Sequence, residues 1–497
     1  MANEIKSDVI GLVVDYLNKK FNTNISTEYY TDIRNWRQWW EGYVESVHSY
    51  RELGVDGSAR KRELYRLGMA KRITEDWAAL LLNEKTTIVT EDNNSAKWLL
   101  GDDSEQGTGG VLGDNNFWAE GNELLEKAFA YGTGAFVARA DGATVNENGA
   151  VIPNAECKAG IEYVDALSII PLSVEKSRIT EAAFISEFTK RGKDYIYIET
   201  HTKGENGNYI IENEYFLLDG MQMKKADLPE NIAPKIDTGS PRPWFSFIYP
   251  NITCNIRTNN GLGMSVYANA LDSLKAVDIA YNNFVKDFKL GGKKVFYNKS
   301  MLQTKTDDKG EVHTITPDDV VQQLFQQVGD GMDFDAKQMV QEFNPALRVQ
   351  ENKDGVQAQL DYLSFKCGMG TKRYQFQASG VKTATEYNGE RQELVQHAQR
   401  HAVVLESALK TLCKALLYIG KEFCNAPVDP DTPININFED GFVIDDVAAR
   451  ENDRQDIRDG ILQHWEYRVK WYGETEEEAK AAIEGMQTAQ NNPFSFA

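Results

Sequence analysis

The segment from Asp354 to Phe423 constrains the fold most, because it predicts a helix, a short loop and an unusually long second helix. The loop is Ala378–Lys382, and Thr383 starts the second helix with Glu386 at the spacing of a capping box. With a rise of 1.5 Å per residue, a helix that continues to Phe423 is about 60 Å long.

The two halves of this long helix differ in character. Its first half, Glu386 to His401, is almost entirely polar, whereas its second half has the 3–4 spacing of a buried face. The apolar residues with that spacing are Leu405, Leu409, Leu412, Leu416, Ile419 and Phe423. Such a helix leaves a core to project into a cavity or a neighbouring subunit, an arrangement typical of ring-forming conduit proteins.

Length and charge narrow the possible functions. The chain has 497 residues, of which 41% are apolar, enough for about three domains with their own cores. Its net charge of -21 argues against a protein that wraps DNA or coats an anionic membrane, because such proteins need a basic surface. This net negative charge is compatible with a protein that lines a channel through which DNA slides.

Cysteine usage and the N-terminus indicate a reducing compartment. The five cysteines show no CxxC spacing, so we expect neither a disulfide framework nor a zinc or redox site. Cys413 and Cys424 lie in the long helical run and are expected in the core. We expect no signal peptide, and no apolar run reaches the length of a membrane span.

The order of helix and strand signals along the chain predicts an α+β fold that is mainly helical. Residues 1 to about 130 look helical, with aromatic or apolar stripes in Arg34–Tyr43 and Met69–Leu82, whereas Asn93–Asn116 looks like an exposed loop. Residues 131–250 carry strand signals.

Turn and cap residues place further elements. Two hairpins are expected, at Asn148-Gly149 and Asn206-Gly207. Ser265 is expected to cap a helix that ends at Gly291-Gly292. The remaining elements predicted are a second helix from about Gly355, a strand at Ile434–Phe438 and two closing helices, the last from Thr475.

Candidate catalytic motifs are weak throughout. Gly261-Leu262-Gly263 is half of a dinucleotide-binding pattern, no phosphate-binding loop with a GK[ST] ending exists, and Gly132-Thr133-Gly134 suits a turn or close packing. His397 and His401 have a metal-chelating spacing, but Ala398 stands where a zinc protease has glutamate. We therefore expect no catalytic residue, no metal and no cofactor.

A basic cluster stands out against the acidic background, and it has two interpretations. Lys286, Lys289, Lys293 and Lys294 come at the end of the helix that begins at Ser265. They could complement the dipole at the helix C-terminus. Alternatively, they could form a ring of positive charge when several subunits align around an axis, and Lys382 in the short loop could do the same.

Several stretches resemble the portal proteins of tailed siphophages of Gram-positive hosts. The early helix KRITEDWAALLLNEK (71–85), the strand entry FAYGTGAFVAR (129–139) and the strand ending YIYIETH (195–201) are similar to that family. So are VKTATE (381–386), at the junction with the long helix, and the tail from IRDGIL to YGETEEEAKAAI. The resemblance covers most of the chain.

The resemblance implies a portal-like subunit with named regions. Residues 1–262 would be most of the wing, 263–290 the first stem helix, 291–352 the clip and 353–378 the second stem helix. Residues 379–385 would be the tunnel loop, 386–424 the long wing helix and 425–497 the crown. The residues expected to face a DNA channel are Ser379, Gly380, Val381, Lys382 and Thr383.

The implied function is structural. The family forms a ring, usually of about twelve subunits, at one capsid vertex of the virion, after synthesis in the host cytoplasm. That ring nucleates assembly, conducts double-stranded DNA during packaging and ejection, and docks the terminase large subunit and the head–tail connector. Capsid and scaffolding proteins are further expected partners, and no membrane is involved.

Two other functions stay open from the residues alone. A DNA-processing or metal-dependent hydrolase would use His397, His401 and nearby carboxylates. Another head–tail ring protein would share the oligomer without placing Lys382 in a lumen.

Overall fold

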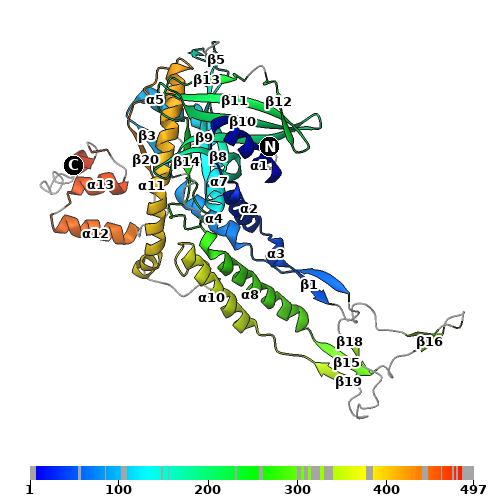
Figure 1. Cartoon of the computed structure of the whole chain (residues 1–497). Coiled ribbons are helices and arrows are strands. Elements are labelled where there is room, and N and C mark those ends of the chain that lie inside the picture. The colour runs from blue at the N-terminus through cyan, green and yellow to red at the C-terminus, as the bar shows by residue number, and fades with distance from the viewer. Residues whose placement is uncertain are drawn as a thin grey trace, which may run out of the picture. The chain divides into compact units, whose positions relative to one another are not determined.

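The computed structural model describes residues 7–53, 58–83, 85–101, 109–146, 149–154, 156–229, 232–256, 261–298, 304–306, 310, 312–314, 325–328, 340–376, 384–438, 446–460, 462–472, 475–476 and 479–483. The fold is α+β, with 45% helix and 25% strand (Figure 1). The chain divides into two compact units, one of residues 1–377 and 396–438, the other of residues 378–395 and 439–497. Within the described ranges, no helix has the length and apolar character needed to cross a membrane.

The first unit begins with helices that bury their apolar stripes. The helices are α1 (Ser7–Phe21), α2 (Glu28–Trp40), α3 (Glu45–His48), α4 (Met69–Leu81) and α7 (Phe117–Tyr131). Trp36 and Trp39 of α2 are buried, as is Trp77 of α4, so the predicted stripes are confirmed as core. β1 (Ser49–Leu53) and β2 (Ala59–Glu63) form an antiparallel pair after α3.

The expected loop over Asn93–Asn116 is wrong. This segment contains α5 (Asn93–Leu100) and α6 (Gly110–Asp114). Asp92 caps α5, because its side chain accepts a hydrogen bond from the Ser95 N–H at 2.8 Å. Leu99 and Ser95 are both fully buried, so this helix packs into the first unit although half of its residues are polar.

The centre of the first unit is a pair of antiparallel sheets. The larger sheet has the strand order β12-β11-β10-β9-β8, with β13 also paired to β11, and the smaller has the order β14-β4-β7. Their bounds are β4 (Gly134–Asp141), β7 (Lys158–Asp165), β8 (Ile169–Glu175), β9 (Arg178–Lys190), β10 (Lys193–Lys203), β11 (Tyr209–Asp219), β12 (Gln222–Ala226), β13 (Lys235–Asp237) and β14 (Phe245–Ile248).

Both predicted hairpins are confirmed. The β10–β11 ladder pairs Lys203 with Tyr209 across the Asn206-Gly207 turn. The short strands β5 (Thr144–Val145) and β6 (Val151–Ile152) pair around Gly149. Gly149 and Gly207 both have a φ of 82°, a left-handed conformation that favours glycine.

Two glycine segments cross in close contact where α7 meets β4. A Cβ added to Gly132, which has a φ of 91°, would lie 2.6 Å from the Gly263 carbonyl oxygen. A Cβ added to Gly263 would in turn meet the Gly132 carbonyl oxygen and lie 2.7 Å from Tyr249 Cβ. The Gly263 N–H donates to the Thr133 hydroxyl at 2.9 Å. Close packing therefore accounts for both glycine patterns.

Two helices, α8 and α10, run side by side (Figure 1). α8 (Leu271–Leu290) ends at Gly291 as expected, but it begins after Ser265 and a 3-10 turn at Ala268–Ala270. α10 (Val349–Lys366) begins before Gly355. Between them the described strands are β15 (Lys294–Asn298), β16 (Thr304–Thr306), β17 (Val312–Thr314), β18 (Phe325–Val328) and β19 (Val340–Phe343), of which β15 pairs with β18 and β19.

The long helix is confirmed as α11 (Ala384–Glu422), of 39 residues. Its predicted apolar face is buried, and Leu409, Leu416 and Ile419 are each 0% exposed. Cys413 is also buried, whereas Cys424 is only half-buried and follows the helix end. The strand after it, β20 (Ile434–Asn437), pairs with β3 (Thr87–Thr90).

The second unit contains α12 (Asp446–Arg458) and α13 (His464–Tyr472). Asp453 joins them, because it accepts from Trp471 Nε1 at 2.6 Å and pairs with Lys470 Nζ at 2.7 Å. Helical residues follow at 476 and 479–483, and the Ala479 N–H donates to the Thr475 carbonyl, as in the predicted last helix.

Candidate functional site

The predicted channel loop is not among the residues that the structure describes. Ser379, Gly380, Val381, Lys382 and Thr383 all lie outside the described residues. The candidate site that the structure does describe is the α8–α10 helix pair, which carries the predicted basic cluster.

Two lysines of the basic cluster contact tyrosines of the β1–β2 region. Lys286 Nζ lies 4.9 Å from the centroid of the Tyr50 ring and donates to its hydroxyl at 2.9 Å. Lys289 Nζ lies 4.6 Å from the Tyr65 centroid and donates to that hydroxyl. Because a tyrosine ring attracts a cation without neutralising it, both positive charges persist.

The other two lysines behave differently. Lys293 forms an ion pair with Glu342 at 2.8 Å, and both side chains are about half exposed. Lys294 begins β15, and its side chain lies outside the described part of the chain. Lys289 sits in the last turn of α8, where it also complements the helix dipole, so both interpretations of the cluster stay compatible with its geometry.

Buried polar groups fix the position of α8. Asp278 accepts hydrogen bonds from the Leu67 N–H at 2.8 Å and from His48 Nε2 at 3.1 Å. His48 Nδ1 accepts from the Val44 N–H, so Nε2 must carry the proton that it donates to Asp278. Asn282 accepts from the Tyr65 N–H at 3.2 Å. These bonds tie one face of α8 to the segment around β1 and β2.

Replacing Asp278 should loosen this attachment. In Asp278→Ala, His48 Nε2–H and the Leu67 N–H lose their acceptor, and we expect a loss of about 2–3 kcal/mol in the free energy of unfolding. Asp278→Asn keeps one acceptor oxygen and should lose about half as much. Chemical denaturation measures the change, and Asp272→Ala, an exposed position of the same helix, should cost no more than about 1 kcal/mol. Equal losses at both positions would contradict the assigned role of Asp278.

The far end of α8 is clamped to the start of α10. The Arg348 guanidinium pairs with Asp287 at 2.7 Å, and Asn352 Nδ2 donates to the same carboxylate at 2.9 Å. These bonds hold the pKa of Asp287 below its ordinary value, the hydrogen bond from Arg348 being the largest cause. The two chain segments that enter and leave the β15–β19 region are therefore tied together.

Large apolar side chains are concentrated on the surface of this part of the chain. Nine of the sixteen exposed ones lie between residues 279 and 376, which is a small fraction of the described chain. They are Ile279, Phe288, Leu290, Phe343, Leu347, Val349, Tyr362, Phe365 and Phe376. Six of them belong to α8 or α10, so this helix pair carries more exposed apolar side chains than single scattered residues would give.

The histidine pair of the hydrolase hypothesis lies on α11, but His401 is a core residue. Its ring makes edge contacts with Trp77 and Phe129, and its Nδ1 accepts the Asn251 N–H at 2.9 Å. Burial, with smaller contributions from His397 and Arg400, lowers the pKa of His401 to about 3. Among the described residues, no group of three or more His, Cys, Asp or Glu could hold a metal ion.

The lowered pKa of His401 predicts a pH-dependent stability. Between pH 6.5 and about 3 the unfolded chain binds a proton at this histidine and the folded chain does not, so stability falls as pH falls. From pH 7 to pH 5 the loss should be about 2 kcal/mol. Urea denaturation at both pH values measures it. His401→Gln should remove this component, whereas the exposed His464→Gln should keep it; an unchanged pH response in His401→Gln would contradict the assignment.

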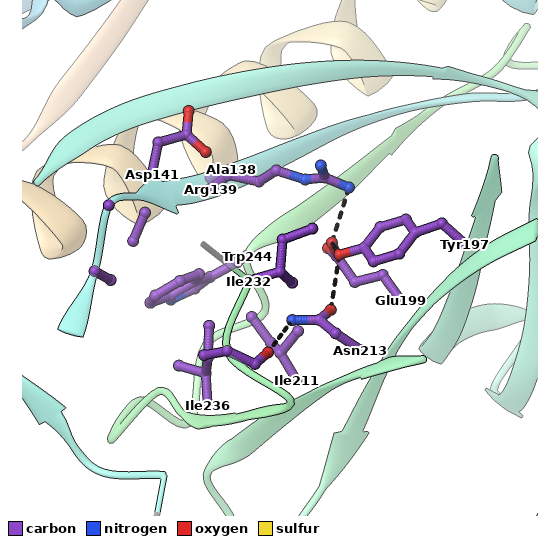
Figure 2. A pocket seen from close by; sticks show the side chains of 14 residues that line it. Ala138, Arg139, Asp141, Tyr197, Glu199, Ile211, Asn213, Ile232, Ile236 and Trp244 are labelled. Atoms are coloured by element: carbon purple, nitrogen blue, oxygen red, sulfur yellow. Dashed lines mark hydrogen bonds and ion pairs between the residues drawn. The ribbon is translucent and has the colours of Figure 1, made fainter. Parts of the chain in front are cut away.

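A second feature, which the sequence did not suggest, is a buried ionic network between the two sheets (Figure 2). Glu199 on β10 accepts from Arg139 on β4 at 2.8 Å and from His201 Nε2 at 2.8 Å. Although burial opposes ionisation, these partners, Arg139 foremost, hold the pKa of Glu199 at about 2. Glu162 on β7 also pairs with Arg139, but burial raises the pKa of this carboxyl.

Comparison with known families identifies the family of this chain. The model of the family described as "Phage portal protein, SPP1 Gp6-like" matches residues 19–488. The chain belongs to this portal protein family. A search of curated proteins gives no match.

Membership in this family assigns the chain a phage portal function, with DNA packaging into the capsid as its setting. The portal is a structural protein of the virion, placed as a homo-oligomeric ring at a capsid vertex and in contact with DNA. No observation favours the hydrolase alternative or another head–tail ring protein.

Proposed function

We propose that this portal chain conducts DNA through a ring whose wall is built by the α8–α10 helix pair. In this proposal α8 and α10 are the cores of the two stem helices, residues 291–352 the clip, 379–385 the tunnel loop, 386–424 the long wing helix and 425–497 the crown. The remaining N-terminal part, residues 1–262, is most of the wing. The terminase motor, the scaffolding protein and the head–tail connector are the partners proposed for the assembled ring.

The observation that carries this proposal is the surface of the α8–α10 pair. Its exposed apolar side chains, such as Phe288, Tyr362 and Phe365, suit burial against neighbouring copies of the chain. Its lysines, Lys286 and Lys289, keep their charge on neutral tyrosines and suit brief contacts with phosphates. A subunit wall with both properties fits a ring that DNA passes through without being held.

Ring formation is the first test. Native mass spectrometry with negative-stain imaging should find a ring with a central hole, of about 670 kDa for about twelve chains of 56.1 kDa. The double variant Tyr362→Asp and Phe365→Asp should leave the chain folded, because both residues are exposed, but should reduce ring formation. If the double variant folds and forms rings as well as the wild type, α10 is not part of the subunit interface.

The tunnel loop needs a functional test. Replacing Val381 or Lys382 with tryptophan should impair DNA packaging or retention while rings still assemble, because a bulky side chain would obstruct the proposed channel. Packaged DNA per particle is the measurement, and Met221→Trp, at an exposed position of the first unit, is the control. Unchanged packaging would count against the loop assignment but not against ring formation.

A further inference from the structure

Cys157 and Cys424 lie next to each other in the first unit, although their positions in the sequence predicted no redox site. Cys157 comes directly before β7, and Cys424 follows the end of α11. The two side chains share a hydrogen bond. Both thiols are free, so the structure shows this pair in its reduced form.

Asn154 ties together the two segments that carry these cysteines. Its N–H donates to the Phe423 carbonyl at 3.0 Å, and its side-chain oxygen accepts from the Cys157 N–H at 2.7 Å. The residue that positions Cys157 is thereby bonded to the residue before Cys424. A disulfide closes without strain only where the backbone already brings two cysteines together, and these hydrogen bonds provide such a junction.

The end of α11 is held rigidly at this junction. Phe423 is buried, and its ring centroid lies 4.9 Å from that of Trp244. The Cys424 N–H donates to the Ile419 carbonyl at 3.1 Å. Asn425 then takes a left-handed conformation, with a φ of 55°, which is typical of a helix end. The contact between the two thiols therefore belongs to a well-packed part of the chain.

The two thiols differ in exposure and in acidity. Cys424 is half-buried, whereas Cys157 is only 6% exposed. The hydrogen bond from Cys157 lowers the pKa of the Cys424 thiol, although burial opposes this effect. The same hydrogen bond, together with burial, raises the pKa of the Cys157 thiol. Because the thiolate is the nucleophile in disulfide exchange, Cys424 is suited to attack first and Cys157 to attack second.

We propose that Cys157 and Cys424 form a reversible disulfide by exchange with a low-molecular-weight disulfide, and that this bond locks the end of α11 to the segment that enters β7. The Cys424 thiolate attacks one sulfur of the small disulfide and releases one small thiolate. Cys157 loses its proton to solvent and attacks the Cys424 sulfur, which releases the second small thiolate. The protein dithiol is oxidised, and the small disulfide is reduced to two thiols.

The redox environment decides when this lock is closed. Cytosolic thiols keep protein cysteines reduced, whereas a virion outside the cell is not in contact with that pool. The bond is therefore open while the chain is made and assembled, and it closes in the released particle.

Peptide mapping of the full-length chain tests the bond. After incubation with oxidised glutathione and alkylation of the remaining thiols, mass spectrometry should find the Cys157 peptide joined to the Cys424 peptide. Dithiothreitol should restore both free thiols. Persistence of both thiols, a stable glutathione adduct on Cys424, or a bond from Cys424 to another cysteine would overturn the proposal.

Serine variants separate the attacking thiol from the resolving one. Cys157→Ser should leave glutathione attached to Cys424, because no second thiol displaces it. Cys424→Ser should leave the buried Cys157 unmodified. Cys254→Ser, which removes another half-buried thiol, should form the bond as the wild type does. Equal uptake of glutathione by Cys157 and Cys424 in the two single variants would contradict the assigned order of attack.

Hydrogen exchange measures the lock itself. The N–H groups of Cys424 and Ala426 both donate to carbonyls of α11, so their exchange reports opening of the helix end. Oxidation should slow this exchange at least about tenfold in the wild type and leave it unchanged in Cys424→Ser. Unchanged exchange in a wild-type chain that carries the disulfide would refute the lock. None of these measurements requires a ring, so they do not depend on the proposed channel.

Discussion

Replacing Leu409 and Leu416 together with aspartate should prevent the chain from folding. Both side chains are 0% exposed on α11, so each aspartate would bury a charge without a partner. Each substitution should cost at least about 4 kcal/mol, and the pair would exceed much of the total stability of about 5–15 kcal/mol that folded domains have. The yield of soluble chain and its far-UV circular dichroism measure the effect.

The same helix offers a matched control. Val403 is 62% exposed, so Val403→Asp introduces the same charge on α11 without burying it. This variant should keep the wild-type spectrum and yield. A folded Leu409→Asp and Leu416→Asp double variant would show that the buried face of α11 is not essential to the fold.

The second large effect is expected from Gly263→Ala. The new methyl group would run into the Gly132 carbonyl oxygen and Tyr249, and the first of these is backbone that cannot move aside independently. We expect a loss of about 3 kcal/mol in the free energy of unfolding, at the upper end of the usual cost of overpacking. Thermal and chemical denaturation of the variant measure it.

Gly355→Ala is the matched comparison, because it makes the same chemical change with the opposite expected sign. A Cβ at Gly355, within α10, would meet nothing within 4 Å. Alanine there should stabilise the helix by about 0.5–1 kcal/mol. If both variants lost stability alike, the steric explanation for Gly263 would be wrong.

Local patterns predicted the elements that depend on local physics. The 3–4 spacing of apolar residues predicted α4 and α11, and Asn-Gly pairs predicted both hairpins. The bounds of α8 and α10 were less accurate. Ser265 does not cap α8, because its hydroxyl accepts a hydrogen bond from the Tyr267 N–H in the turn before the helix. Gly355 lies inside α10, although the sequence predicted that the helix begins there.

Features that depend on distant contacts were missed. Arg139 and Glu199 lie on strands of different sheets, and neither belongs to a periodic pattern that would pair them. The tyrosine partners of Lys286 and Lys289 come from a segment more than two hundred residues earlier. The sequence showed the lysine cluster, but it did not show which residues pack against these lysines.

Tyr50 and Tyr65 restrict the side-chain motion of Lys286 and Lys289. A free lysine side chain loses up to about 2 kcal/mol of rotational entropy when an anion immobilises it. At Lys286 and Lys289 part of that loss has already occurred in the folded chain, because each ammonium group rests on a ring. In the proposed channel, an approaching phosphate would therefore meet a charge that is already held in place. Phosphate contact at these two lysines would cost less side-chain entropy than contact at a lysine without such a partner.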